Sequence, residues 1–144
     1  MKIYLDNSCF NRPFDDQKQL RIKLETEAKL NIQERIFQKE IELTWSYIMD
    51  FENEANPFEQ RKLVIKGWKN YASVDTDETK EIVKKAESFH KMGIRSKDSI
   101  HLACAISMRC EYFLTTDDEL IKKASGINEI KITDPISFIK EVTE

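Results

Sequence analysis

Short apolar runs alternate with longer amphipathic segments along this whole chain, and that alternation constrains the fold more than any other feature. The apolar runs predict strands at 2–6, 41–45, 112–115 and 130–133. When helices fall between successive strands, the strands run parallel and helices cover both faces of the sheet. The pattern therefore predicts an α/β protein with a central parallel sheet, whose ligand site lies beyond the carboxyl ends of the strands.

Amphipathic spacing and capping residues predict the helices. Apolar residues recur at every fourth position from Leu20 to Ile36, which indicates a helix over 17–39. Ser46 can cap a short helix after the second strand, and Ser96 can cap a helix over 97–108. Two more are expected late in the chain, one that stops at Gly126 and one that Asp134-Pro135 opens.

The segment between the second and third predicted strands is expected to be purely helical. It opens on Asn56-Pro57-Phe58-Glu59, a capping-box pattern with proline at the first helical position, and this helix should reach about residue 66. A second helix is predicted over 77–92, with Gly93 just past its end. Since the segment contains no predicted strand, we expect 57–92 to form a helical arm beside the sheet.

Length and composition describe one globular domain, which we take to span residues 1–144. A net charge of −3 argues against a nucleic-acid-binding protein that works by bulk positive charge, but it allows local or metal-mediated contacts. Three cysteines without a Cys-x-x-Cys pair are expected to be buried thiols, and a reducing cytoplasm is the simplest location. No apolar run approaches the ~20 residues of a membrane helix, so we expect no membrane association.

Two predicted strands end in an aspartate. Asp6 follows the first strand and is itself followed by small polar residues, while Asp117 ends the third strand. In a parallel sheet both carboxylates then leave the same edge. Each aspartate could instead serve only a turn or a helix cap, and we expect one of Asp117 and Asp118 to be the cap of the next helix. Asp117 is taken as the inward residue because it is nearer the strand.

Two further acids lie on helices that lean toward the core. Glu52 extends the apolar stripe of Ile48, Phe51 and Ala55, although its side chain could simply reach water. Asp98 stands in the first turn of a helix that is apolar nearly all round; the helix dipole alone would also favour it there. Four carboxylates close together repel one another unless a hard cation lies between them, and oxygen ligands suit Mg²⁺ or Mn²⁺.

Four motifs of this chain resemble the PIN-domain family of metal-dependent ribonucleases, which includes the VapC-like toxins of toxin–antitoxin pairs. They lie in the order and over the span of a whole PIN domain, from Ile3 to about Phe138. The motifs are Ile3-Tyr4-Leu5-Asp6-Asn7-Ser8, the run from Ser46 to Glu52, the Asp-led run from Lys97 to Ala105, and Leu114-Thr115-Thr116-Asp117-Asp118.

The resemblance implies a three-layer α/β/α sandwich and cleavage of RNA with Mg²⁺ or Mn²⁺ held by the four acids. It implies that Asn7, Ser8 and Thr115 orient those acids through hydrogen bonds. A homodimer and a cognate antitoxin are the partners typical of this family. Asn7 stands where the family more often has Thr or Ser, and the insertion 11–16 is not part of the common motif. The toxin role and the RNA substrate therefore stay open.

Three cations flank the predicted site and are candidate RNA contacts: Arg12, Arg95 and Lys97. Two other functions are considered. A magnesium-binding phosphoacceptor signalling domain would need a lysine at a late strand end, where this chain has Asp134-Pro135. A catalytically idle protein-binding module is the other, because Leu63, Val64 and Trp68 are more apolar surface than one helix needs.

Overall fold

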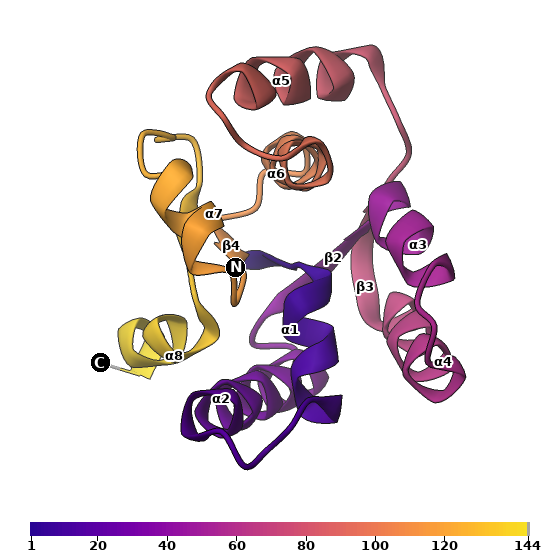
Figure 1. Ribbon diagram of the computed structural model, residues 1–144, viewed down its shortest axis with the longest axis vertical. Helices are drawn as coiled ribbons and strands as arrows, with labels where there is room; N and C mark the ends of the chain where they lie inside the picture. Colours follow the sequence, from indigo (N-terminus) through magenta and orange to yellow (C-terminus); the bar gives the residue numbers. More distant parts are fainter. Residues whose placement is uncertain (144) are drawn as a thin grey trace.

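The computed structural model describes residues 1–143, which form a parallel sheet with helices packed on both of its faces (Figure 1). The five strands lie in the order β3-β2-β1-β4-β5. Their bounds are Lys2–Leu5 for β1, Glu42–Ser46 for β2, Ala72–Thr76 for β3, Tyr112–Leu114 for β4 and Lys131–Thr133 for β5. The expected three-layer α/β/α fold with a central parallel sheet is confirmed.

The order of the strands places a switch point at β1. The chain leaves β1 toward β2 and β3, and it then returns to the opposite side of β1 to form β4 and β5. β1 and β4 pair in register from Ile3 with Tyr112 to Leu5 with Leu114. Ligands of open parallel sheets bind where neighbouring strands lead off in opposite directions, so the carboxyl ends of β1 and β4 mark the expected site.

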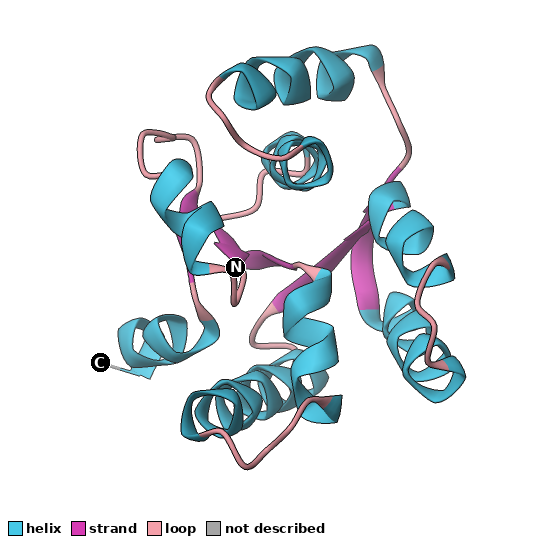
Figure 2. Ribbon diagram, in the orientation of Figure 1, coloured by secondary structure: helices cyan, strands magenta, loops and turns pink. Residues whose placement is uncertain are grey.

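Helices cover the sheet on two sides (Figure 2). In Figure 1, α2 and α8 lie below the sheet, whereas α5 and α6 lie above it. The helices are α1 (Asn7–Asn11), α2 (Leu20–Phe37), α3 (Tyr47–Glu54), α4 (Glu59–Trp68), α5 (Lys80–Lys91), α6 (Ser96–Ser107), α7 (Asp118–Lys123) and α8 (Pro135–Thr143), with short 3₁₀ turns at Arg12–Phe14 and Lys69–Tyr71. No helix within residues 1–143 combines the length and the apolar character that crossing a bilayer requires.

The core is a single apolar cluster between these layers. The side chains of Ile3, Tyr4 and Leu5 in β1 and of Phe113 and Leu114 in β4 are buried, as the apolar runs predicted. The three cysteines are free and buried, which confirms their expected role as small apolar residues. Gly93 has a φ of +96°, a conformation that glycine adopts easily at the end of a helix.

The expected helical arm is wrong, because the segment 57–92 contains β3. This strand pairs parallel with β2 at the edge of the sheet. Its exposed residues, Ser73 and Asp75, are polar and alternate with the half-buried Ala72, Val74 and Thr76. Only one face of the strand is apolar, and only weakly so. That is why the sequence shows no apolar run here.

Several helix starts also differ from expectation. α4 begins at Glu59 rather than Pro57, and the Asn56 side chain accepts a hydrogen bond from the Phe58 N–H at 3.1 Å ahead of the helix. α6 begins at Ser96, which leaves Arg95 at the capping position. Ser46 does precede α3, but its hydroxyl makes no capping bond because it contacts the Tyr4 hydroxyl instead.

Candidate functional site

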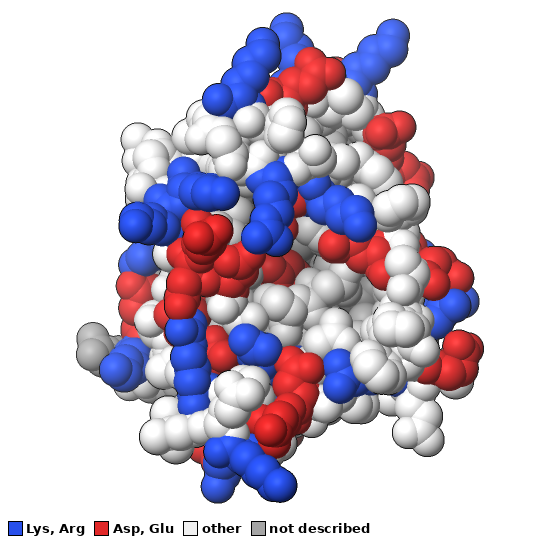
Figure 3. All heavy atoms as spheres, in the orientation of Figure 1, with Lys and Arg blue, Asp and Glu red and all other residues white. Residues whose placement is uncertain are grey.

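The four predicted acids line one cavity at the carboxyl edge of the sheet. Asp6 follows β1, Glu52 lies in α3, Asp98 in the first turn of α6, and Asp117 follows β4. The cavity has a volume of about 450 Å³. It is lined by Asp6, Asn7, Ser8, Glu52, Arg95, Ser96, Lys97, Asp98, His101 and Asp117. Figure 3 shows acidic atoms gathered around a hollow in the middle of this face, with cationic side chains along its upper edge.

Hydrogen bonds fix both the backbone and the side chain of Asp6. Its backbone N–H donates to the Leu114 carbonyl at 3.1 Å, which ties the end of β1 to β4. The Ser8 hydroxyl donates to its carboxylate, and the Cys9 N–H donates to the same oxygen at 3.3 Å. Burial raises the pKa of Asp6, against the hydrogen bonds from Ser8 and Thr115 that favour its ionised form. The ionised carboxylate is therefore costly where it stands.

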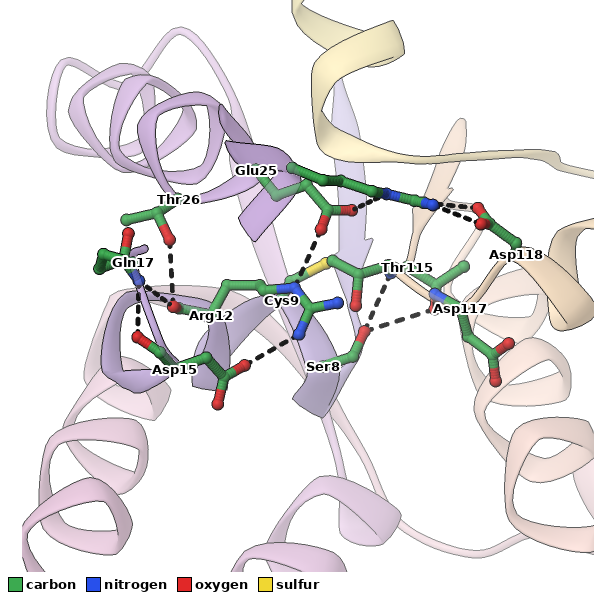
Figure 4. A network of polar contacts seen from close by, with 12 residues as sticks. Ser8, Cys9, Arg12, Asp15, Gln17, Glu25, Thr26, Thr115, Asp117 and Asp118 are labelled. Carbon is green, nitrogen blue, oxygen red and sulfur yellow. Dashed lines mark hydrogen bonds and ion pairs between the residues drawn. The ribbon is translucent and has the colours of Figure 1, made fainter. Parts of the chain in front are cut away.

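Asp117 lines the cavity and also caps α7. Its Oδ1 accepts from the backbone N–H groups of Glu119 at 3.0 Å and Leu120 at 3.2 Å. We expected one of Asp117 and Asp118 to cap and the other to face inward, but Asp117 does both. Asp118 instead forms an ion pair with Arg21 at 2.5 Å, and Figure 4 shows the two carboxylates pointing in different directions.

Thr115 links the ends of β1 and β4. Its hydroxyl oxygen accepts from the Asp117 N–H at 3.1 Å and lies 3.4 Å from the Ser8 hydroxyl. The Thr116 N–H donates to the Ser8 hydroxyl oxygen at 3.0 Å (Figure 4). Ser8 and Thr115 therefore fix the backbone on which Asp6 and Asp117 stand, which is consistent with the orienting role that the family resemblance implied.

Glu52 is oriented by a buried chain of polar groups. His101 Nε2 contacts Glu52 Oε1, and Asn7 donates its amide to the same oxygen at 3.0 Å. His101 Nδ1 lies 2.5 Å from the Tyr4 hydroxyl, which in turn lies 2.6 Å from the Ser46 hydroxyl. Since a carboxylate only accepts, His101 Nε2 carries a proton and donates it to Glu52. Burial opposes ionisation of Glu52, but the bonds from His101 and Asn7 outweigh it and lower its pKa.

The other acids of the cavity disfavour the charged form of Asp98, and no cation offsets their effect through an ion pair. Burial raises its pKa, and the charges of Asp6, Asp117 and Glu52 raise it further, while His101 acts in the opposite sense. The four acids therefore repel one another across the cavity. Within residues 1–143 no cation forms an ion pair with Asp6, Asp98 or Asp117.

The three candidate RNA contacts separate into two groups. Arg95 and Lys97 line the cavity, as expected for residues that could meet a phosphate. The placement of Arg12 beside the site is wrong. Its guanidinium bonds Glu25 at 3.0 Å and Asp15 at 2.9 Å on the α2 side, and it is not among the residues that line the cavity (Figure 4). The Arg12 side chain points this way because the buried Glu25 carboxylate needs a cation beside it.

The chemistry of the donor set fits a hard divalent cation. Four carboxylates line one cavity, and a positive ion between them would relieve the repulsion that raises the pKa of Asp98. The side chains stand apart in this structure: no three His, Cys, Asp or Glu residues among residues 1–143 already form a compact ligand group. Their roles as metal ligands stay a prediction.

Sequence reasoning missed the groups that orient Glu52. The link of His101 to Tyr4 and Ser46 was not foreseen. The available signal is a tyrosine in the middle of a fully buried strand, because a buried hydroxyl needs a polar partner. Nothing in the sequence shows that this partner is a histidine from α6.

Comparisons with known proteins find matches in structure but none in sequence. No protein-family model matches the chain, and no curated protein matches it in sequence. Three solved structures match over almost the full length of both chains. VapBC-1 from nontypeable Haemophilus influenzae is 17% identical with a TM-score of 0.58, covering 94% of this chain and 98% of that one. VapBC2 from Rickettsia felis, bound to a DNA fragment from its promoter, is 14% identical with a TM-score of 0.60, covering 93% and 98%.

The third structure is FitAcB from Neisseria gonorrhoeae, 14% identical with a TM-score of 0.57, covering 92% of this chain and 97% of that one. At these identities the likeness establishes a shared fold. It agrees with the PIN-like architecture expected from the sequence motifs.

Proposed function

We propose that this chain is a metal-dependent ribonuclease that hydrolyses phosphodiester bonds of RNA. Asp6, Glu52, Asp98 and Asp117 would hold Mg²⁺ or Mn²⁺. The observation that carries the proposal is that four segments far apart in the chain bring carboxylates to one cavity at the switch point of the sheet. Three of them, Asp6, Asp98 and Asp117, have no cation beside them among residues 1–143, and such unpaired carboxylates are costly to folding, which favours a functional reason for them.

The residues of the chain divide the chemistry among them. A bound cation would lower the pKa of a coordinated water and neutralise charge that develops on the phosphate. Asn7 and His101 hold Glu52 in one orientation, while Ser8 does the same for Asp6. Asp98 or Asp117 would orient the attacking water. Arg95 and Lys97 at the rim would attract the phosphates that an acidic cavity otherwise repels.

The partner in this proposal is an antitoxin. The motifs resemble those of VapC-like toxins, and the chain shares its fold with chains of VapBC and FitAcB structures over more than nine-tenths of its length. A toxin of this kind would act in the cytoplasm as a homodimer. Leu63 and Val64 project from α4 as exposed apolar side chains and offer a surface for a protein partner. An adjacent reading frame whose product co-purifies with this chain would support the pairing.

Two neighbouring aspartates provide a matched test of the nuclease. Asp117→Asn keeps a capping oxygen but removes a charge from the cavity, whereas Asp118→Asn removes an exposed charge outside it. We expect Asp117→Asn and Asp98→Asn to lower the rate of RNA cleavage by a factor of about 10³ or more, and Asp118→Asn to leave it within about twofold. EDTA should stop the reaction, and Mn²⁺ or Mg²⁺ should restore it. Equal cleavage by all three variants, in preparations free of other nucleases, would refute the proposal.

A further inference from the structure

A second cavity opens directly beside the acidic one. It has a volume of about 280 Å³, and Asn7 and Glu52 border both cavities. The two spaces are therefore adjacent, and the second lies toward the start of α4. A substrate strand that places a phosphate over the acids would have its neighbouring nucleotide over this second space.

The walls of the second cavity are rich in side-chain amides. They come from Asn7, Asn11, Asn53 and Asn56. The Asn53 amide nitrogen donates to the Lys62 carbonyl at 2.9 Å, and the Asn7 amide nitrogen donates to Glu52. Their two amide oxygens are buried and have no hydrogen-bond partner among residues 1–143, and Asn53 itself is only 5% exposed. Buried acceptors of this kind normally have a partner, so two amides of this wall carry hydrogen-bonding capacity that no group of residues 1–143 uses.

An aromatic ring stands at the mouth of the same cavity. Phe58 is 56% exposed, although it precedes a helix where it could have packed inward. The Arg61 guanidinium lies 4.5 Å from the centre of its ring. Arg61 is in turn fixed by Asp15 at 3.2 Å and by the Phe14 carbonyl at 2.7 Å. An aromatic ring with a guanidinium over it, which Asp15 and the Phe14 carbonyl hold in place, therefore borders the amides.

We propose that this second cavity binds one unpaired nucleobase of single-stranded RNA, adjacent to the phosphate that is cut. The inference rests on the proposed ribonuclease function and adds a base-binding subsite to it. Single-stranded RNA is recognised by stacking bases on aromatic rings or arginine planes and by hydrogen bonds to their edges. Phe58 and Arg61 supply the stacking surface, and the amides supply donors and acceptors for a base edge.

A protein partner fits this cavity less well. The exposed apolar residues of α4, Leu63 and Val64, are not among its lining residues. Its only apolar lining residues are Pro57 and Phe58, which is too little for the apolar face of a helix. The proposed partner surface and the proposed base subsite therefore use different residues of this segment.

The test measures the binding of labelled single-stranded RNA hexamers by fluorescence anisotropy, with Ca²⁺ in place of Mg²⁺. Each hexamer lacks the base at one successive position. We expect the wild-type chain to lose about tenfold in affinity when one particular base is absent. Phe58→Ala should lose about tenfold on the intact hexamer and nothing further when that base is missing, because both changes remove the same contact. Phe58→Trp should retain binding.

Leu63→Ala is the matched control, since Leu63 is 62% exposed on α4, the helix that follows Phe58, but lies outside the cavity. It should bind every hexamer as the wild type does. Thermal unfolding of each variant establishes that it is folded. Equal affinity of Phe58→Ala and wild type for the intact hexamer, additive losses, or no RNA binding by the wild type would each overturn the base subsite.

Cleavage is scored separately, with Mn²⁺ and the intact hexamer. RNA binding that depends on Phe58, without cleavage, would retain the subsite and refute the nuclease. Cleavage with a KM that Phe58→Ala leaves unchanged would retain the nuclease and refute the subsite.

Discussion

Two groups of charged side chains flank the same strand ends, and they are built in opposite ways. On the cavity side, Asp6, Asp98 and Asp117 face one another without a cation. On the α2 side, Glu25 is fully buried but lies against two guanidinium groups: Arg12 Nε is 3.0 Å from one of its oxygens, and Arg21 Nε is 3.7 Å from the other (Figure 4). The fold can pair a buried acid, yet it leaves three of the four acids that line the cavity without a cation.

This difference separates structure from function. A buried acid beside a cation helps to specify the fold, and removing the cation destabilises the protein because the acid's charge is left buried without a partner. A group of unpaired acids lowers stability, so its presence calls for a ligand that compensates the charge. The comparison can be challenged at each group by removing one charge and measuring the free energy of unfolding.

The largest change in stability is expected at Arg12. Arg12→Ala leaves the buried Glu25 carboxylate with only the more distant Arg21, and breaking a buried pair in this way should cost about 3 kcal/mol. Unfolding in urea measures the loss. The double variant Arg12→Ala/Glu25→Gln should recover most of it, since no charge is then stranded. If the double variant is as unstable as the single changes added together, the pair is not the cause.

Lys29 extends the comparison to a buried cation. Its ammonium lies 4.7 Å from the Trp68 ring centre and 5.3 Å from that of Phe10, and it takes part in no ion pair in the described part of the chain. Burial lowers its pKa to about 8. The unfolded chain has a pKa near 10.4 at this group, so between about pH 8 and 10.4 it binds more protons than the folded chain, and stability should rise with pH.

Lys29→Met should therefore stabilise the protein by about 2 kcal/mol at pH 7, after the lost cation–ring attraction is deducted. The gain should shrink as the pH rises from 8 toward 10.4, because the folded wild-type chain then loses the proton that burial disfavours. Urea unfolding at pH 7 and pH 10 tests this. A gain that does not depend on pH would mean that packing, and not charge, sets the effect.

The smallest expected change is at Asp6, and its sign is opposite to that at Arg12. Burial raises the pKa of Asp6, so the ionised form is disfavoured in the folded chain at pH 7. Asp6→Asn keeps the oxygen that caps α1 and should stabilise the metal-free protein by about 1 kcal/mol in EDTA. Mg²⁺ should then raise the unfolding temperature of the wild type but not of the variant. A loss of stability in EDTA would show that this carboxylate serves the fold alone.

The sequence allowed some of these features to be predicted and not others. Asp6 and Asp117 could be predicted because each follows a buried apolar run, and parallel strands bring their ends to one edge. β3 was not predicted because an edge strand with Ser73 and Asp75 on its exposed face has no apolar run. The contacts of Arg12 were not predicted for a different reason. An arginine near a site in sequence can turn toward any buried acid that the tertiary fold supplies, and here that acid is Glu25.

The way in which the chain contributes its acids also has a consequence for synthesis and for engineering. Asp6 and Glu52 precede the turn between β3 and α5, and Asp98 and Asp117 follow it. A ribosome that has made only the first half of the chain has made two of the four acids, so the proposed cation site would stay incomplete until Asp117 has been added. A break in that turn would give two fragments that each carry half of the proposed site, and their reassembly would place the proposed nuclease activity under the control of whatever brings them together.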